Sequence, residues 1–193
     1  MTKKTNILAA TVATLLLSSC SVNLNDYVLD EKAQNKKAFD LKEYFTGNVI
    51  ARGMLQDYSN KVTRRFCVEI KGTWQENNGT LAEKFYFNDG EISYRNWQLI
   101  KAKNGTYTGT AEDVVGKAIG KHQGFAFQLQ YDLLLKVKES TYQVSMDDWM
   151  FQLDEYRVMN KTAISKLGVN VANVTLFFDK KAPVQTCQSQ SKN

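Results

Sequence analysis

Proline, histidine and cysteine are scarce in this chain of 193 residues, which holds one proline, one histidine and three cysteines. The single proline, Pro183, falls near the C-terminus, so no proline interrupts the hydrogen bonding of earlier strands. The only histidine, His122, has no metal-ligand or nucleophile motif around it. Its flanking glycines place it in a loop or at the start of a strand, and we favour an exposed loop residue. The sequence therefore predicts no metal site, no cofactor and no catalytic residue.

A long hydrophobic run and a strong charge of either sign are also missing. The most apolar segment spans residues 7–17, which is too short to cross a bilayer. The formal net charge is +5. Because the lysines and arginines are spread along the chain and do not form a block, nucleic acid is not an expected partner.

The N-terminal segment is typical of a bacterial lipoprotein signal peptide. Two lysines precede the apolar segment, and small residues then lead to a cysteine in Leu17-Ser18-Ser19-Cys20, the pattern of a lipobox. Cleavage would remove residues 1–19 and leave Cys20 to carry acyl chains, so the expected partner is a membrane. Ser21 in place of aspartate after the cysteine favours the outer membrane, facing the periplasm.

Two further cysteines, Cys67 and Cys187, fall in a strand pattern and in the polar C-terminal tail. We favour two unrelated thiols, one packed and one exposed. The alternative is a disulfide that ties the tail to the barrel wall, which an oxidising compartment would permit.

Three segments follow the signal peptide. Residues 20–38 are polar without a sustained apolar period, which predicts a lipidated tether. Residues 39–181 form one domain, which we expect to be a β-barrel, and residues 182–193 form a polar tail.

At the start of the domain, Asp40 can cap a short helix that plugs one end of the barrel. Leu41, Tyr44 and Phe45 would share one face of this helix, and Gly47 would end it.

From residue 48 onward, apolar and polar residues alternate with a period of two, which predicts β-strands. The longest alternation runs from Phe125 to Leu135. Turn signals separate the runs at Asn77-Asn78-Gly79, Asn88-Asp89-Gly90 and Lys103-Asn104-Gly105. We count about nine strands at short spacing. The predicted fold class is all-β: an up-and-down antiparallel barrel or a strongly curved sheet, with a short N-terminal helix.

Several predicted strands carry one ionisable residue on an otherwise apolar face. These candidate ligand-binding residues are Arg52, Arg64, Glu83, Arg95 and Asp148. If these faces point inward, the charges must pair or bind a charged group, and arginine suits a carboxylate or phosphate. The expected apolar walls are Phe85, Trp97, Phe127 and Met146. The alternative, which the sequence alone favours, is a structural salt-bridge network or charges at the barrel rims.

A set of short motifs resembles a known family. In chain order they are Gly53-Met54-Leu55-Gln56-Asp57, Arg65-Phe66, Gly72-Thr73-Trp74, Asn88-Asp89-Gly90-Glu91, Arg95-Asn96-Trp97, residues 107–116, Asp147-Asp148-Trp149-Met150 and Gly168-Val169. Together, over residues 39–180, they resemble the bacterial lipoproteins of domain-of-unknown-function family 3833. The resemblance implies an envelope lipoprotein with a lipocalin-like shape, and it supplies no catalytic residues.

Three functions remain open on the sequence. The first is a non-enzymatic lipoprotein that binds or presents an amphiphile, such as a fatty acid or a phospholipid-like molecule, with arginines at its acidic end. The second is an envelope scaffold or interaction protein whose barrel is filled by side chains. The third is an enzyme of envelope lipid modification with Glu83 or Asp148 as a general base, which would need a strongly perturbed carboxylate beside a second functional group.

Overall fold

The computed structural model describes residues 22–28, 38–137, 139–184 and 186–188. The predicted signal peptide, Cys20 and most of the tether lie outside these described residues. The elements in chain order are η1 (Leu24–Tyr27), α1 (Leu41–Tyr44), β1 (Gly47–Asp57), β2 (Val62–Gln75), β3 (Asn78–Phe87), β4 (Ile92–Lys101), β5 (Tyr107–Thr110), β6 (Val114–Gln123), β7 (Ala126–Val137), β8 (Ser140–Gln152), β9 (Arg157–Lys166) and β10 (Val169–Asp179).

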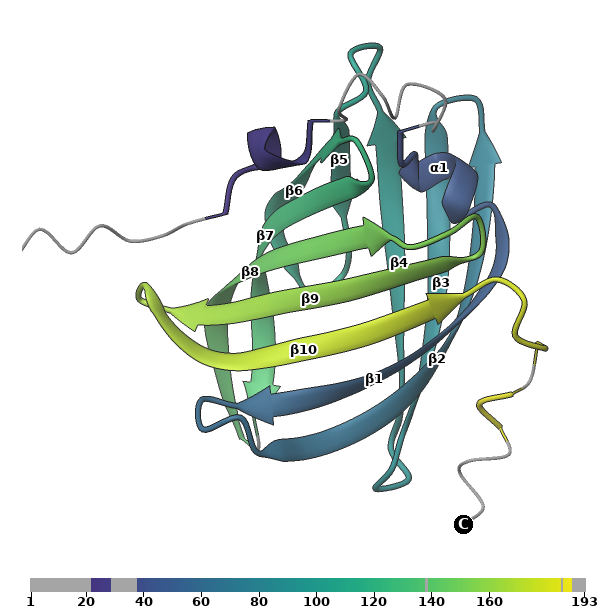
Figure 1. The fold of residues 1–193 in the computed structure, drawn as a ribbon. Coiled ribbons are helices and arrows are strands. Elements are labelled where there is room, and N and C mark those ends of the chain that lie inside the picture. The colour runs from purple at the N-terminus through teal and green to yellow at the C-terminus, as the bar shows by residue number, and fades with distance from the viewer. Residues whose placement is uncertain (1–21, 29–37, 138, 185, 189–193) are drawn as a thin grey trace, which may run out of the picture.

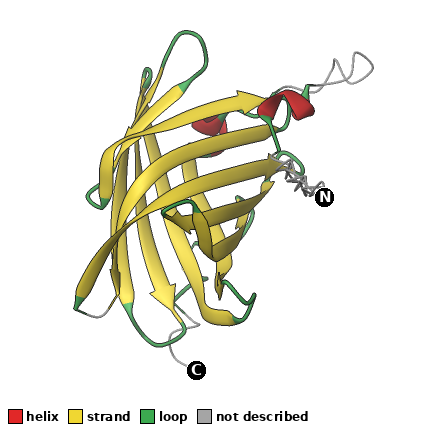
Figure 2. Cartoon of the chain, turned by 90° about the vertical axis from the view of Figure 1, so that its left-hand side faces the viewer, coloured by secondary structure: helices red, strands yellow, loops and turns green. Residues whose placement is uncertain are grey.

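The ten strands form one closed antiparallel barrel (Figures 1 and 2). Each strand pairs with the next one along the chain, and β1 also pairs with β10 to close the ring. The prediction of an all-β up-and-down barrel is confirmed, with ten strands where we expected about nine. The four residues of β5 offer too few alternations to be counted as a strand from sequence.

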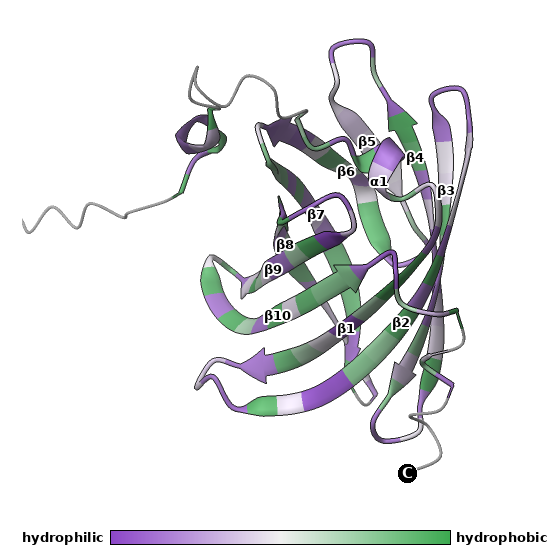
Figure 3. Cartoon of the chain, turned by 45° about the vertical axis from the view of Figure 1, so that its right-hand side comes forward, coloured by the Kyte–Doolittle hydropathy of each residue, from purple (hydrophilic) through white to green (hydrophobic). Residues whose placement is uncertain are grey.

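The alternation predicted from the sequence sets which side chains enter the barrel. On β2, Arg64, Phe66, Val68 and Ile70 all face the interior, as their shared face predicts. Figure 3 shows the same alternation as bands of hydrophobic and hydrophilic residues along the strands. Because side chains alternate across a strand, the interior receives every second residue.

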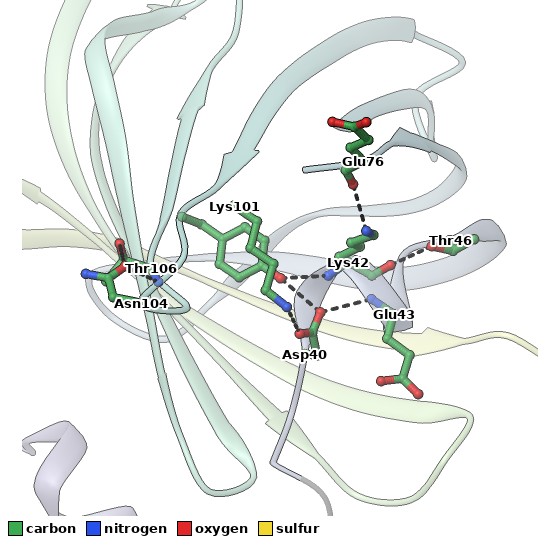
Figure 4. Close-up of polar contacts among 9 residues, drawn as sticks. Asp40, Lys42, Glu43, Thr46, Glu76, Lys101, Asn104 and Thr106 are labelled. Carbon is green, nitrogen blue, oxygen red and sulfur yellow. Dashed lines mark hydrogen bonds and ion pairs between the residues drawn. The ribbon is translucent and has the colours of Figure 1, made fainter. Parts of the chain in front are cut away.

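Helix α1 plugs one end of the barrel. Asp40 caps it by accepting a hydrogen bond from the Glu43 N–H (3.1 Å). The same carboxylate pairs with Lys101 and accepts a hydrogen bond from the Tyr107 hydroxyl (2.9 Å) (Figure 4). The predicted cap and short helix are confirmed. The apolar side chains predicted for its inner face are buried: Leu41, Tyr44 and Phe45.

Two of the three predicted turns lie where the sequence signals place them. Gly90 and Gly105 have positive φ angles of 86° and 82°, the conformation that glycine adopts without strain. The β2–β3 hairpin turns earlier than predicted, at Glu76 (φ 50°). Gly79 lies within β3, where the Trp74 ring covers it so closely that a Cβ would lie 2.5 Å from the ring.

Cys67 and Cys187 form a disulfide, and both residues are buried. The favoured prediction of two unrelated thiols is therefore wrong. The tail folds back over the outer face of the barrel, where the disulfide packs against Ile50 and Tyr86. Sequence spacing could not show this contact, because 120 residues separate the two cysteines.

Candidate functional site

A cavity of about 320 Å³ lies inside the barrel. Its walls come from α1 and from the inward faces of the strands, and nearly all of its lining side chains are apolar. Leu41 and Phe45 form its floor at the plugged end. At the opposite end, hereafter the open end, it reaches the turn between β3 and β4, where Phe87 lines it. A pocket of this size and composition is typical of a small-molecule site.

Eight of the nine residues predicted for a binding site line this cavity. They are Arg64, Glu83, Phe85, Arg95, Trp97, Phe127, Met146 and Asp148. The ninth, Arg52, is exposed on the outer face of the barrel, so the expectation that it faces inward is wrong. Both faces of β1 are apolar there, because Ile50 is covered from outside by the disulfide of the tail. Alternation alone therefore could not tell the inside of β1 from the outside.

Arg64 lies at the open end and is held by acidic residues of the β3–β4 turn. Its Nη2 lies 2.8 Å from Oδ2 of Asp89 and 2.9 Å from Oε2 of Glu91. Its guanidinium group stacks over the Phe87 ring, 3.6 Å from the ring centre. Arg64 is thus both paired and packed before any ligand arrives.

Arg95 is paired with an acid that the sequence did not single out. Its Nη2 and Nε donate to Oδ2 of Asp113 at 2.6 Å and 3.1 Å. Asp113 lies in the turn between β5 and β6. Arg95 also lies opposite Glu83 in the register of β3 and β4. No sequence signal marks Asp113, because an acid in a turn is usually a solvent-exposed residue.

The two carboxylates of the cavity wall titrate far from their ordinary range. Burial raises the pKa of Glu83 to about 7, against the opposing effects of Arg95 and the Trp97 indole. Burial likewise raises the pKa of Asp148 to about 6, although hydrogen bonds from Asn160 and Thr162 favour its charged form. Both groups therefore exchange protons near neutral pH.

Asp148 is held by two polar side chains of β9 that the sequence analysis did not name as site residues. It accepts hydrogen bonds from the Asn160 amide and from the Thr162 hydroxyl (3.2 Å), both on β9. Both side chains are buried. Tyr131 on β7 also faces this region, and burial raises its pKa. Sequence reasoning missed Asn160 and Thr162 as site residues, because a polar residue in a strand normally indicates the solvent face.

His122 lies at the end of β6, half-buried, and not in an exposed loop as predicted. Within the described residues, no group of three or more His, Cys, Asp or Glu side chains is placed to hold a metal ion. Across those same residues, helices are too short and too polar to traverse a bilayer.

Comparison with known proteins supports the fold and the family. The barrel is similar to the S-type phycobiliprotein lyase CPES from Guillardia theta, with a TM-score of 0.56 and 10% sequence identity. The likeness covers 75% of this chain and 94% of the lyase, and it confirms the lipocalin-like architecture. No curated protein matches the sequence. The model of one family matches residues 14–180, and by this match the chain belongs to the family "Protein of unknown function (DUF3833)".

Proposed function

We propose that this protein is a membrane-anchored lipoprotein of the bacterial envelope that holds an amphiphilic molecule inside its barrel. One observation carries the proposal: the cavity of about 320 Å³ with apolar walls and a few polar groups. A single acyl chain is elongated and apolar, and it matches such a lining. The plug formed by α1 leaves the open end as the route of entry.

The alternative of an envelope scaffold with a solid barrel fits less well. That function predicts an interior without a void larger than a few water molecules. A cavity of about 320 Å³ exceeds this limit many times over. Protein interiors are otherwise closely packed, so a void of this size is unusual unless it is used.

Anchoring to a membrane is proposed from the lipobox that ends at Cys20. The disulfide between Cys67 and Cys187 supports an envelope location, because such bonds persist in oxidising compartments. Cell fractionation tests the anchor. We expect the wild-type chain in the outer-membrane fraction and the Cys20→Ser chain among the soluble proteins. Equal membrane retention of both chains would contradict lipid anchoring.

Native mass spectrometry of the protein purified from its own host tests the bound amphiphile. We expect an added mass of lipid size in the wild-type protein. Ala172 lines the cavity, so Ala172→Trp should block the space and remove that mass. The matched control is Asn173→Trp, one residue along β10 and outside the cavity lining. No added mass in the wild type, or equal masses in both variants, would argue against a ligand-binding barrel.

One observation favours a second candidate, an enzyme of envelope lipid modification. Glu83 has a pKa of about 7 and lies opposite Arg95, which together provide a general base beside a second functional group. This function predicts that envelope extracts contain a lipid converted by the wild-type protein and left unchanged by Glu83→Gln. A lipid that co-purifies unaltered, or equal conversion of a lipid by the wild type and Glu83→Gln, would decide against it.

A further inference from the structure

The charged groups around the cavity are predominantly acidic. Two guanidinium groups reach it, those of Arg64 and Arg95. Five carboxylates lie in the lining or in contact with those two arginines: Glu83, Asp89, Glu91, Asp113 and Asp148. Once Glu83 and Asp148 are ionised, the cavity and its mouth therefore carry an excess of negative charge.

Both arginines have already been neutralised by protein carboxylates. Arg64 contacts two acids of the β3–β4 turn, and Arg95 donates two hydrogen bonds to Asp113. An anionic head group, such as that of a fatty acid, would have to displace these carboxylates or accept their repulsion. The arginines therefore do not make this cavity an anion site.

Glu83 and Asp148 differ from these arginines, because they line the cavity without a counter-ion in contact. Among the described residues, neither forms an ion pair. Asp148 is held by the uncharged Asn160 and Thr162, and Glu83 lies opposite an arginine that is already bound to Asp113. A buried carboxylate without a counter-ion in contact is stabilised by a cation that comes within ion-pair distance.

We propose that the cavity selects amphiphiles with a cationic head group, of the alkyl ammonium type, and discriminates against fatty acids. The head group lies between Glu83 on β3 and Asp148 on β8, and the alkyl chain lies along the apolar walls. This inference rests on the proposed ligand-binding function and names its ligand class.

The preference depends on pH in a defined direction. The charged and titratable groups that face Glu83 are Arg95 on β4, Asp113 in the β5–β6 turn, Tyr131 on β7 and Asp148 on β8. Glu83 itself and Asp148 lose their protons between mildly acidic and neutral pH, because their pKa values are about 7 and about 6. An alkyl ammonium group stays protonated over the same range, since amines of this type titrate near pH 10. Binding of the cation therefore strengthens as the pH rises, and binding of a carboxylate weakens.

Three probes with the same chain test this preference: dodecylamine, dodecanol and dodecanoate. Each is titrated below its micelle concentration into the full chain carrying Cys20→Ser, in detergent-free buffer at pH 5.5 and pH 8. At pH 8 we expect dodecylamine to bind at least about tenfold more tightly than dodecanoate, with dodecanol between them. At pH 5.5 the difference should shrink to about twofold.

The variant Glu83→Gln keeps the size and shape of the side chain and removes its charge. We expect it to weaken dodecylamine about tenfold at pH 8 and to leave dodecanol within about twofold. Unchanged dodecanol binding also shows that the barrel is folded. The matched control is Glu155→Gln, an exposed acid in the β8–β9 turn at the plugged end, which should change none of the affinities.

The outcomes separate this inference from the proposed function. Equal or tighter binding of dodecanoate at pH 8, or a Glu83→Gln variant that still prefers dodecylamine, overturns the cationic preference and leaves an amphiphile-binding barrel. If none of the three probes binds, the proposed function fails and the inference fails with it.

Discussion

The two ends of this barrel are built differently. At the plugged end, α1 and the residues around it bury aromatic and aliphatic side chains almost completely, and Asp40 ties the helix to β4 and β5. At the open end, Tyr58 and Leu167 are 80% and 96% exposed at the tips of their turns. Ion pairs lie at the mouth there, beside the packed rings of Phe66, Phe85 and Phe87. The plugged end therefore contributes stability, and the open end leaves a route to the interior.

Truncating one apolar side chain at each end tests whether the two ends differ in stability, and this test has the largest expected effect. Phe45 is 2% exposed and packs against Phe178, so Phe45→Ala should cost about 3–5 kcal/mol of unfolding free energy. Leu167→Ala at the open end should change it by less than about 0.5 kcal/mol. Urea denaturation followed by circular dichroism measures both. Equal losses would mean that the two ends do not differ in stability.

The second largest effect concerns the disulfide on the outer wall. The double variant Cys67→Ser, Cys187→Ser should lose about 2–5 kcal/mol, because the bond closes a long loop in the unfolded chain. Thermal unfolding with and without a reducing agent checks this. The reductant should lower the melting temperature of the wild type and leave that of the variant unchanged. A reductant effect of the same size in both proteins would assign the loss to another cause.

A smaller effect is expected at the cap of α1. Asp40→Ala removes the acceptor for the Glu43 N–H and the Tyr107 hydroxyl and leaves Lys101 without its partner. We expect a loss of about 2 kcal/mol, measured by urea denaturation. Asp40→Asn retains the cap without the charge and should recover about half of that loss. No recovery by asparagine would mean that the ion pair with Lys101 dominates.

The smallest expected change in unfolding free energy concerns Glu83 inside the cavity. The pKa of Glu83 rises from 4.5 to about 7 on folding, so the folded protein holds a proton that the unfolded chain releases. Its unfolding free energy therefore falls as the pH rises through this range. Glu83→Gln should stabilise the empty barrel by about 1 kcal/mol at pH 8 and by nothing at pH 4. Equal unfolding curves at pH 8 would show that burial of this carboxylate costs nothing.

Much of the fold could be predicted because alternation is a local property. The inward faces of β2, β3, β4, β7 and β8 follow from the period of two, and this placed eight of the nine predicted residues in the cavity. The prediction failed at Arg52, where both faces of the strand are apolar. It also missed Asp113, which reaches Arg95 on β4 from the β5–β6 turn. Both outcomes depend on how separate segments of the chain come together, and no local pattern encodes that.

Local sequence patterns specify the class of this protein: antiparallel strands, a capped helix at their start and acidic and basic residues on apolar faces. These features follow from side-chain alternation and backbone hydrogen bonding, which act over a few residues. The closed ring, the disulfide that binds the tail and the neutralisation of both cavity arginines become visible only in the folded chain. Charge balance inside a cavity is a sum over many strands, so it exists only once those strands surround a common space.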